Sequence, residues 1–124
     1  MISDIEVAWL AGLYEGEGCL TRQGAHWTLT IAMVDEDVIR RAHSITGVGR
    51  LHAPTASAPK LWRWCVSRRA DLVPLVLLLL PHLGERRAGR AREFLAWHER
   101  GPRLPGELPP VLTSRIHADM LITD

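Results

Sequence analysis

Residues 9–18, with the sequence WLAGLYEGEG, are the stretch around which the rest of the chain is organised. Apolar residues before and within it recur at helical spacing, at Ile5, Trp9 and Leu13. This spacing predicts an amphipathic helix with Ser3 or Asp4 as its N-cap. Glu15 and Glu17 would lie at the negative C-terminal end of that helix, where each anion costs about 0.3–1 kcal/mol. Two acids in so unfavourable a place suggest that this end of the helix holds a cation.

The two acids cannot share one ion within a single chain. Glu15 and Glu17 are two residues apart, about 200° around a helix, so they point to different sides. Gly12 and Gly16 lie on one face, where the missing side chains allow another backbone to approach closely. That neighbour is either a second copy of the helix, which would bring a second glutamate to the same place, or the chain's own sheet.

Length and composition indicate one globular domain. The chain has 124 residues, 47% of them hydrophobic, and a net charge of +1. Fourteen of its fifteen cations are arginine, which suits phosphates and guanine edges, although GC-rich codon usage would produce the same bias. Cys19 and Cys65 are too few for a disulfide framework. The apolar run 72–83 is too short to cross a bilayer, so we expect a soluble, cytoplasmic protein without a membrane partner.

The middle of the chain predicts a β-hairpin followed by a helix. Segments 19–23 and 26–34 flank a two-residue connection, and the second alternates apolar and polar residues as a half-buried strand does. Asp35 is a natural N-cap and Gly47 a natural stop for a helix over 35–46.

The second half repeats the pattern. The predicted elements are strands at 48–53 and 60–67, a buried helix at 71–80, an amphipathic helix at 84–100 and a short helix at 115–121. The chain is therefore α+β, in the order α-β-β-α-β-β-α-α, with a four-stranded antiparallel sheet covered by helices on one face. Residues 1–100 form the domain, and 101–124 are a Pro-rich C-terminal extension.

One face of the predicted sheet is polar and has nothing else in the chain to cover it. Its side chains are Thr21, Gln23, His26, Thr28, Thr30, Arg50, His52, Arg63 and Ser67. Only Ala32, Leu61 and Cys65 interrupt this set. Arg22, Lys60, Arg68 and Arg69 are expected to touch phosphates or water.

Residues 10–18, LAGLYEGEG, resemble the signature nonapeptide of the LAGLIDADG homing endonucleases, with Glu in place of both Asp residues. The predicted element order agrees with the single-motif core of that family over residues 5–100. Further matches are Asp35 after the second strand, the turn at 47–49, and Pro81-x-Leu83 before a basic helix start.

The resemblance implies site residues. In the family the acid at the eighth motif position binds the metal together with the preceding main-chain carbonyl; here these are Glu17 and Gly16, and Glu15 is left as an exposed acid. An all-oxygen shell selects Mg²⁺, with Mn²⁺ or Ca²⁺ as substitutes. Asp35 would hold the water network near the metal, or serve only as an N-cap. Arg86 stands where relatives commonly have Lys, and it could stabilise phosphate charge but not act as a base. Both Arg86 and the neighbouring candidate Arg87 could instead be solvated residues of a helix start.

The resemblance also implies a function. The chain would be a homodimeric homing endonuclease, with Gly12 and Gly16 at the dimer interface. It would hydrolyse phosphodiester bonds in a long, near-palindromic double-stranded DNA, read by the polar sheet face, and would have no small-molecule substrate. The cut would promote copying of its own mobile reading frame in a bacterial or phage-infected cell. The alternatives are a non-cleaving relative, acting as an intron maturase or a DNA-binding regulator, and a protein-interaction module.

Overall fold

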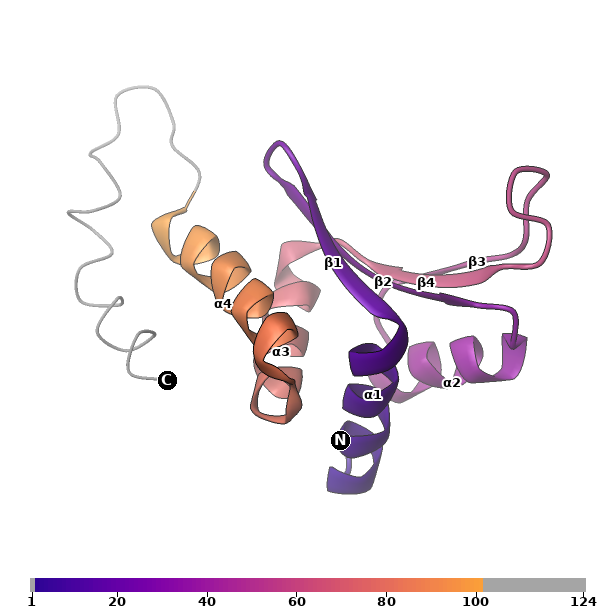
Figure 1. Cartoon of the computed structure of the whole chain (residues 1–124), viewed down its shortest axis with the longest axis horizontal. Coiled ribbons are helices and arrows are strands. Elements are labelled where there is room, and N and C mark those ends of the chain that lie inside the picture. The colour runs from indigo at the N-terminus through magenta and orange to yellow at the C-terminus, as the bar shows by residue number, and fades with distance from the viewer. Residues whose placement is uncertain (1, 102–124) are drawn as a thin grey trace.

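Helix α1 (Asp4–Glu17) runs without a loop into strand β1 (Gly18–Gln23), so the sheet begins where the acidic helix ends. The fold is seen in a computed structural model that describes residues 2–101 (Figure 1). The other elements are β2 (His26–Met33), α2 (Glu36–Thr46), β3 (Arg50–His52), β4 (Trp62–Val66), α3 (Arg69–Leu79), the 3-10 helix η1 (Leu80–His82) and α4 (Glu85–Arg100). This is the predicted order; the short helix predicted at 115–121 lies outside the described residues.

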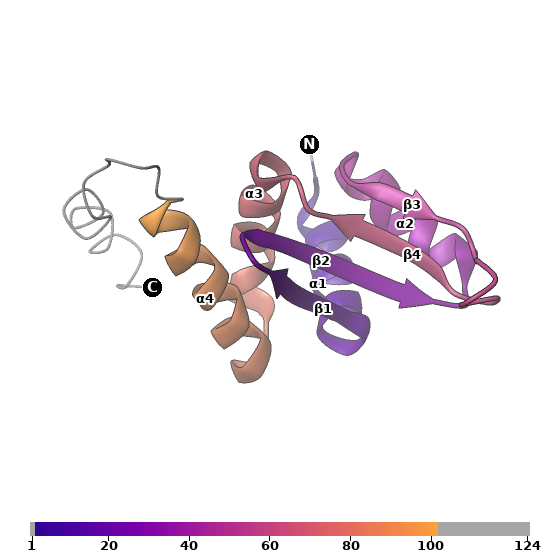
Figure 2. The ribbon, with the colours of Figure 1, turned by 90° about the horizontal axis from the view of Figure 1, so that it is seen from above.

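The four strands form one antiparallel sheet in the order β1-β2-β4-β3. Within residues 2–101 the four α-helices lie on one side of it and leave the other side open, as Figures 1 and 2 show. The predicted architecture is confirmed. β1 and β3 are the two edge strands, and α4 runs alongside the β1 edge.

Helix α1 begins with a reciprocal capping box. The Ser3 hydroxyl accepts from the Glu6 N–H at 3.1 Å, and the Glu6 carboxylate accepts from the Ser3 N–H at 3.0 Å. Ser3 is therefore the N-cap, one of the two predicted choices, because its side chain satisfies a backbone donor that the helix leaves free.

The buried face of α1 is not the predicted one. Ile5 is 79% exposed, and Trp9 and Leu13 are only partly buried. The buried residues are Val7, Leu10, Ala11 and Tyr14. Both stripes fit a period of 3.6 residues, so periodicity could not choose between them; contacts of α1 with α3, β1 and β2 decided the face.

The core forms between the inner face of the sheet and the helices. The sheet contributes Trp27, Leu29, Ile31, Trp64 and Val66, and the helices contribute Leu10, Tyr14, Ile39, Leu72, Leu79, Phe94 and Leu95. The alternation predicted for β2 is confirmed, with Met33 only partly buried at its end. The inner face of the sheet is thus largely used for packing, whereas the described helices leave its outer face uncovered.

Two glycines shape the connection from α2 to β3. Gly47 ends α2 in the left-handed conformation, with φ of 69°. Gly49 has φ of 85°, and a Cβ there would lie 2.6 Å from the main-chain oxygen of Cys65. This close approach lets β3 pair with β4. No helix in the described part of the chain is long and apolar enough to cross a membrane.

Candidate functional site

The end of α1 presents a free carboxylate. Glu17 is the last residue of the helix, is exposed, and makes no hydrogen bond or ion pair within residues 2–101. The last helical hydrogen bond runs from the Gly18 N–H to the Tyr14 carbonyl. The carbonyls of Glu15, Gly16 and Glu17 therefore have no donor within the helix. Glu17 and Gly16 both offer unused oxygen ligands at the same point.

Arg87 of α4 supplies a cation at this helix end. Its Nε–H donates to the Glu15 carbonyl oxygen at 2.7 Å, and its Nη1 donates to the Gly18 carbonyl oxygen. The guanidinium also lies 5.4 Å from the centre of the Tyr14 ring. A positive charge is favourable at the negative end of a helix dipole. The chain's own arginine thus provides part of the charge compensation that the two acids require.

Glu15 is a structural residue. Its Oε1 accepts from the Gly84 N–H at 2.7 Å, and its Oε2 lies 3.8 Å from the Arg87 Nε. Glu15 is exposed, as expected, but it is not simply an exposed acid, because its carboxylate also holds the start of α4. The Glu15 carboxylate is thus held by α4, whereas Glu17, two residues on along the helix, has no such partner in the described structure.

Gly12 and Gly16 lie on an open face of α1. Both are exposed, and a Cβ at either would meet no atom within 4 Å in the described structure. The alternative in which these glycines pack on the chain's own sheet is therefore wrong. The face remains available to a second chain.

Asp35 and Arg86 are both exposed and carry no side-chain partner in the part of the chain that the structure describes. Asp35 occupies the N-cap position of α2, but its carboxylate makes no capping hydrogen bond. A side-chain capping role therefore does not explain why an aspartate stands at this position. Asp35 follows β2, in which Ile31 pairs with Gly18, the first residue of β1.

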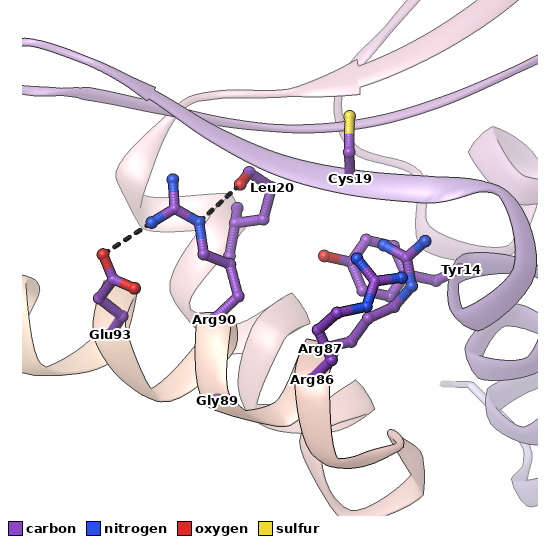
Figure 3. A pocket seen from close by; sticks show the side chains of 8 residues that line it. All are labelled: Tyr14, Cys19, Leu20, Arg86, Arg87, Gly89, Arg90 and Glu93. Atoms are coloured by element: carbon purple, nitrogen blue, oxygen red, sulfur yellow. Dashed lines mark hydrogen bonds and ion pairs between the residues drawn. The ribbon is translucent and has the colours of Figure 1, made fainter.

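Arg86 borders a hollow of about 450 Å³ between α1, β1 and α4 (Figure 3). The hollow is lined by Tyr14, Cys19, Leu20, Arg86, Arg87, Gly89, Arg90 and Glu93. The Arg87 side chain is only 15% exposed, so the alternative of a solvated helix start is wrong for it. Burial raises the pKa of Tyr14 above its ordinary value, which keeps its hydroxyl a hydrogen-bond donor beside these arginines.

The open face of the sheet carries the predicted polar residues in rows across the strands. One row joins Cys19, Thr30, Cys65 and Arg50, and another joins Ala32, Arg63 and His52. Thr21 pairs with Thr28 and Gln23 with His26 on the β1–β2 hairpin, and Ser67 follows β4. Cys19 belongs to this face but was missed; alternation along β1 places it there, and Figure 3 shows it pointing away from α4.

This face is concave and basic at one end. A hollow of about 560 Å³ is lined by His26, Gly49, Arg50, His52, Cys65, Val66, Ser67, Arg68 and Asp71. Arg50 and Arg68 bring cationic side chains to its wall, and Asp71 is the acid among these lining residues. Such a surface attracts a polyanion.

Of the three arginines and one lysine expected to touch phosphates or water, Arg22 and Arg69 also lie beside indole rings. Arg22 lies 5.7 Å from the ring centre of Trp27 and 5.8 Å from that of Trp97. Arg69 lies 4.3 Å from the ring centre of Trp97. These contacts are on the helix side of the sheet, because Trp27 is a buried residue of the inner face. Cation–π contacts hold both arginines.

No group of three or more His, Cys, Asp or Glu residues that could hold a metal occurs within residues 2–101.

No family model matches the chain, and no curated protein matches it. Solved structures, in contrast, match the chain in fold. The homing endonuclease I-CvuI, crystallised with DNA and Mg, matches with a TM-score of 0.62 and 15% identity, over 94% of both chains. The homing endonuclease I-TnaI matches with a TM-score of 0.61 and 19% identity, over 82% of this chain and 77% of that one.

A third similar structure is described by the name of the motif itself. The LAGLIDADG meganuclease I-AabMI, bound to uncleaved DNA, matches with a TM-score of 0.57 and 17% identity, over 76% of this chain and 35% of that one. The nonapeptide at 10–18 lies at the junction of α1 and β1, and the element order is the expected one. The chain has the fold of the LAGLIDADG homing endonucleases.

Proposed function

We propose that the chain is a metal-dependent, site-specific DNA endonuclease that works as a homodimer. The observation that carries this proposal is Glu17, an exposed carboxylate without a protein partner in the described structure, on a helix end where an anion is unfavourable. The similar structures I-CvuI and I-AabMI are complexes with DNA, and I-CvuI was also crystallised with Ca.

The ligands at this point fit a hard divalent cation. Glu17 offers a carboxylate and Gly16 a main-chain carbonyl without an intrahelical donor, and both are oxygen ligands of the kind that Mg²⁺ prefers. Mn²⁺ and Ca²⁺ take the same ligands. The rest of the shell would come from the DNA phosphate and from the second copy of Glu17.

The glycine face of α1 supports the dimer. Gly12 and Gly16 leave room for a second helix to approach, and they lead directly to Glu17. Two such helices side by side would bring one carboxylate from each chain to adjacent positions. Each carboxylate would serve one of the two strands of the duplex.

The side chains around Glu17 have separate tasks. A bound divalent cation supplies charge stabilisation at the phosphate and lowers the pKa of the attacking water. Arg86 stabilises negative charge on the phosphate, and it cannot serve as a base because arginine keeps its proton. Asp35, which makes no capping bond, orients water near the metal ligands.

The open sheet face would read the DNA. A β-ribbon fits the major groove, where hydroxyl, amide, imidazole and guanidinium groups reach base edges. The inner face is filled by the core, so this outer face is the one that can meet the duplex. Arg50 and Arg63 stand in neighbouring rows of it and are the strongest candidates for guanine contacts.

A cleavage assay tests this function. The purified chain is mixed with duplex DNA spanning the sequences that flank its gene, with Mg²⁺ or with EDTA, and nicked and cut products are measured. We expect Mg²⁺-dependent cleavage at one site, and salt-sensitive binding in both conditions. Binding without cleavage would establish a non-cleaving regulator or maturase, and the absence of salt-sensitive DNA affinity would remove the nucleic-acid function altogether.

A further inference from the structure

Two arginines of α4 hold the exposed edge of β1. Arg87 donates to the Gly18 carbonyl, and the Arg90 Nε donates to the Leu20 carbonyl at 3.0 Å (Figure 3). Gly18 and Leu20 are alternate residues of an edge strand, so their carbonyls point to the same side, away from β2. Helix α4 therefore satisfies backbone groups that the sheet leaves unpaired.

Arg87 does more than cover the edge. Its two acceptors are the carbonyls of Glu15 and Gly18, the residues immediately before and after the pair Gly16–Glu17. One planar guanidinium thus holds both ends of the turn in which the proposed metal ligands lie. The Glu15 carboxylate, bound to the Gly84 N–H at 2.7 Å, ties the same turn to α4 a second time.

We propose that Arg87 is a positioning residue, which orients the Gly16 carbonyl and the Glu17 carboxylate toward a divalent cation without touching that cation or the DNA. The proposal rests on the proposed function of Glu17. Its physical basis is that a carboxylate at a helix end has several rotamers and a mobile backbone, and outer contacts that remove this freedom strengthen metal binding.

Whether metal binding becomes weaker or stronger when Arg87 is replaced distinguishes a positioning role from a purely electrostatic one. A cation near a metal site repels the metal, so simple loss of the Arg87 charge would strengthen metal binding. Loss of positioning would weaken it. Arg87→Lys keeps the charge but replaces the planar fork by a single ammonium, which cannot reproduce the two-carbonyl bridge. Electrostatics therefore predicts no change for Arg87→Lys, whereas positioning predicts weaker binding.

The experiment is a Mn²⁺ titration followed by electron paramagnetic resonance on the full chain bound to the duplex used for cleavage. We expect Arg87→Gln and Arg87→Lys each to weaken Mn²⁺ binding about 10- to 100-fold. DNA affinity in EDTA should stay within about threefold of the wild-type value, because Arg87 does not lie on the open face. The matched control is Arg92→Gln, an exposed arginine on the same helix, and it should change neither quantity.

Each outcome of the Mn²⁺ titration either supports or overturns the positioning role of Arg87. Unchanged or tighter Mn²⁺ binding in both Arg87 variants, with the wild type binding Mn²⁺, would overturn the positioning role alone. A wild-type complex that binds no Mn²⁺ would overturn the proposed function, and the positioning role with it. Circular dichroism checks folding; if Arg87→Gln does not fold, Arg87→Lys decides. Unfolding of both would overturn the proposal in favour of a general stabilising role.

Discussion

The Arg87 Nε–H donates to the main-chain carbonyl oxygen of Glu15 at 2.7 Å, across 72 positions of sequence. Helix α1 has no basic residue in its own last turn. The cation that balances its negative end is therefore brought by α4, the last helix among residues 2–101. This contact joins α1 and α4 at the point where the sheet begins.

Glu17 is expected to be indispensable for cleavage. Replacing it by Gln (Glu17→Gln) removes the charged ligand, and several kcal/mol of transition-state stabilisation would be lost with the metal. Such a loss lowers the cleavage rate about a thousand-fold. The rate is measured with Mg²⁺ on the target duplex, and DNA binding in EDTA should be unchanged. A Glu17→Gln chain that cleaves at the wild-type rate would contradict this role.

Glu15 is expected to matter for stability. Glu15→Ala removes the acceptor of the Gly84 N–H and the partner of Arg87, so the free energy of unfolding should fall by about 1 kcal/mol. The measurement is urea denaturation. Glu36→Ala is the control, because it removes an exposed i,i+4 pair with Arg40 and one acid of the first turn of α2, and should cost only about 0.5 kcal/mol. Equal decreases in the free energy of unfolding would show that the Glu15 contacts stabilise the fold no more than an exposed ion pair does.

The glycine face is expected to control association. Gly12→Leu and Gly89→Leu both place a side chain where a Cβ meets no atom within 4 Å in the described structure. Both should keep the fold and gain about 0.8 kcal/mol in helix propensity. Only Gly12→Leu should shift the sedimentation coefficient from dimer to monomer, because it blocks the approach of a second α1. The dimer interface lies elsewhere if the two variants sediment alike.

Arg63 is expected to contribute to DNA recognition. It lies in the row with Ala32 and His52 on the open face. Arg63→Gln should weaken target binding by about 1–3 kcal/mol and relax the base preference at one position, as loss of a guanine contact does. Competition binding with duplexes substituted at single positions measures both effects. Arg92→Gln, on α4, is the control, and an identical small loss in both variants would rule out a base contact by Arg63.

His98 is expected to make stability depend on pH. Burial, and then the charge of Arg69, lower the pKa of His98 below the ordinary value of 6.5. The unfolded chain therefore takes up the proton at a higher pH than the folded chain. The free energy of unfolding should then decrease as the pH falls from about 7.5 toward 5.5.

Thermal unfolding of His98→Gln over this range should show a weaker pH dependence than the wild type. His82→Gln, which replaces an exposed histidine of η1, should follow the wild-type curve. Parallel curves for the wild type and His98→Gln would show that this imidazole does not contribute. The buried His98 Nδ1, which has no hydrogen-bond partner in the described structure, gives a second reason to expect an effect.

Local chemistry was enough to predict much of this fold. The capping residue Ser3, the alternation in β2 and the stop at Gly47 each depend on neighbours within a few positions. Their physical causes, a free backbone donor, a two-residue period and a left-handed backbone, are properties of short segments. The element order and the polar face of the sheet follow from such signals.

By itself, the sequence determined the elements, their order, the polar sheet face and the position of Glu17 at the end of α1. Only the tertiary structure decided which stripe of α1 is buried and that Arg87 and Gly84 engage Glu15. It also decided that Arg22 lies beside the indole rings of Trp27 and Trp97. The physical reason is that the apolar residues of one helix can fit a 3.6-residue period on more than one face. In the same way, the sequence of an arginine does not tell whether its side chain contacts water, a carbonyl or an aromatic ring. Which of these it meets depends on elements tens of residues away.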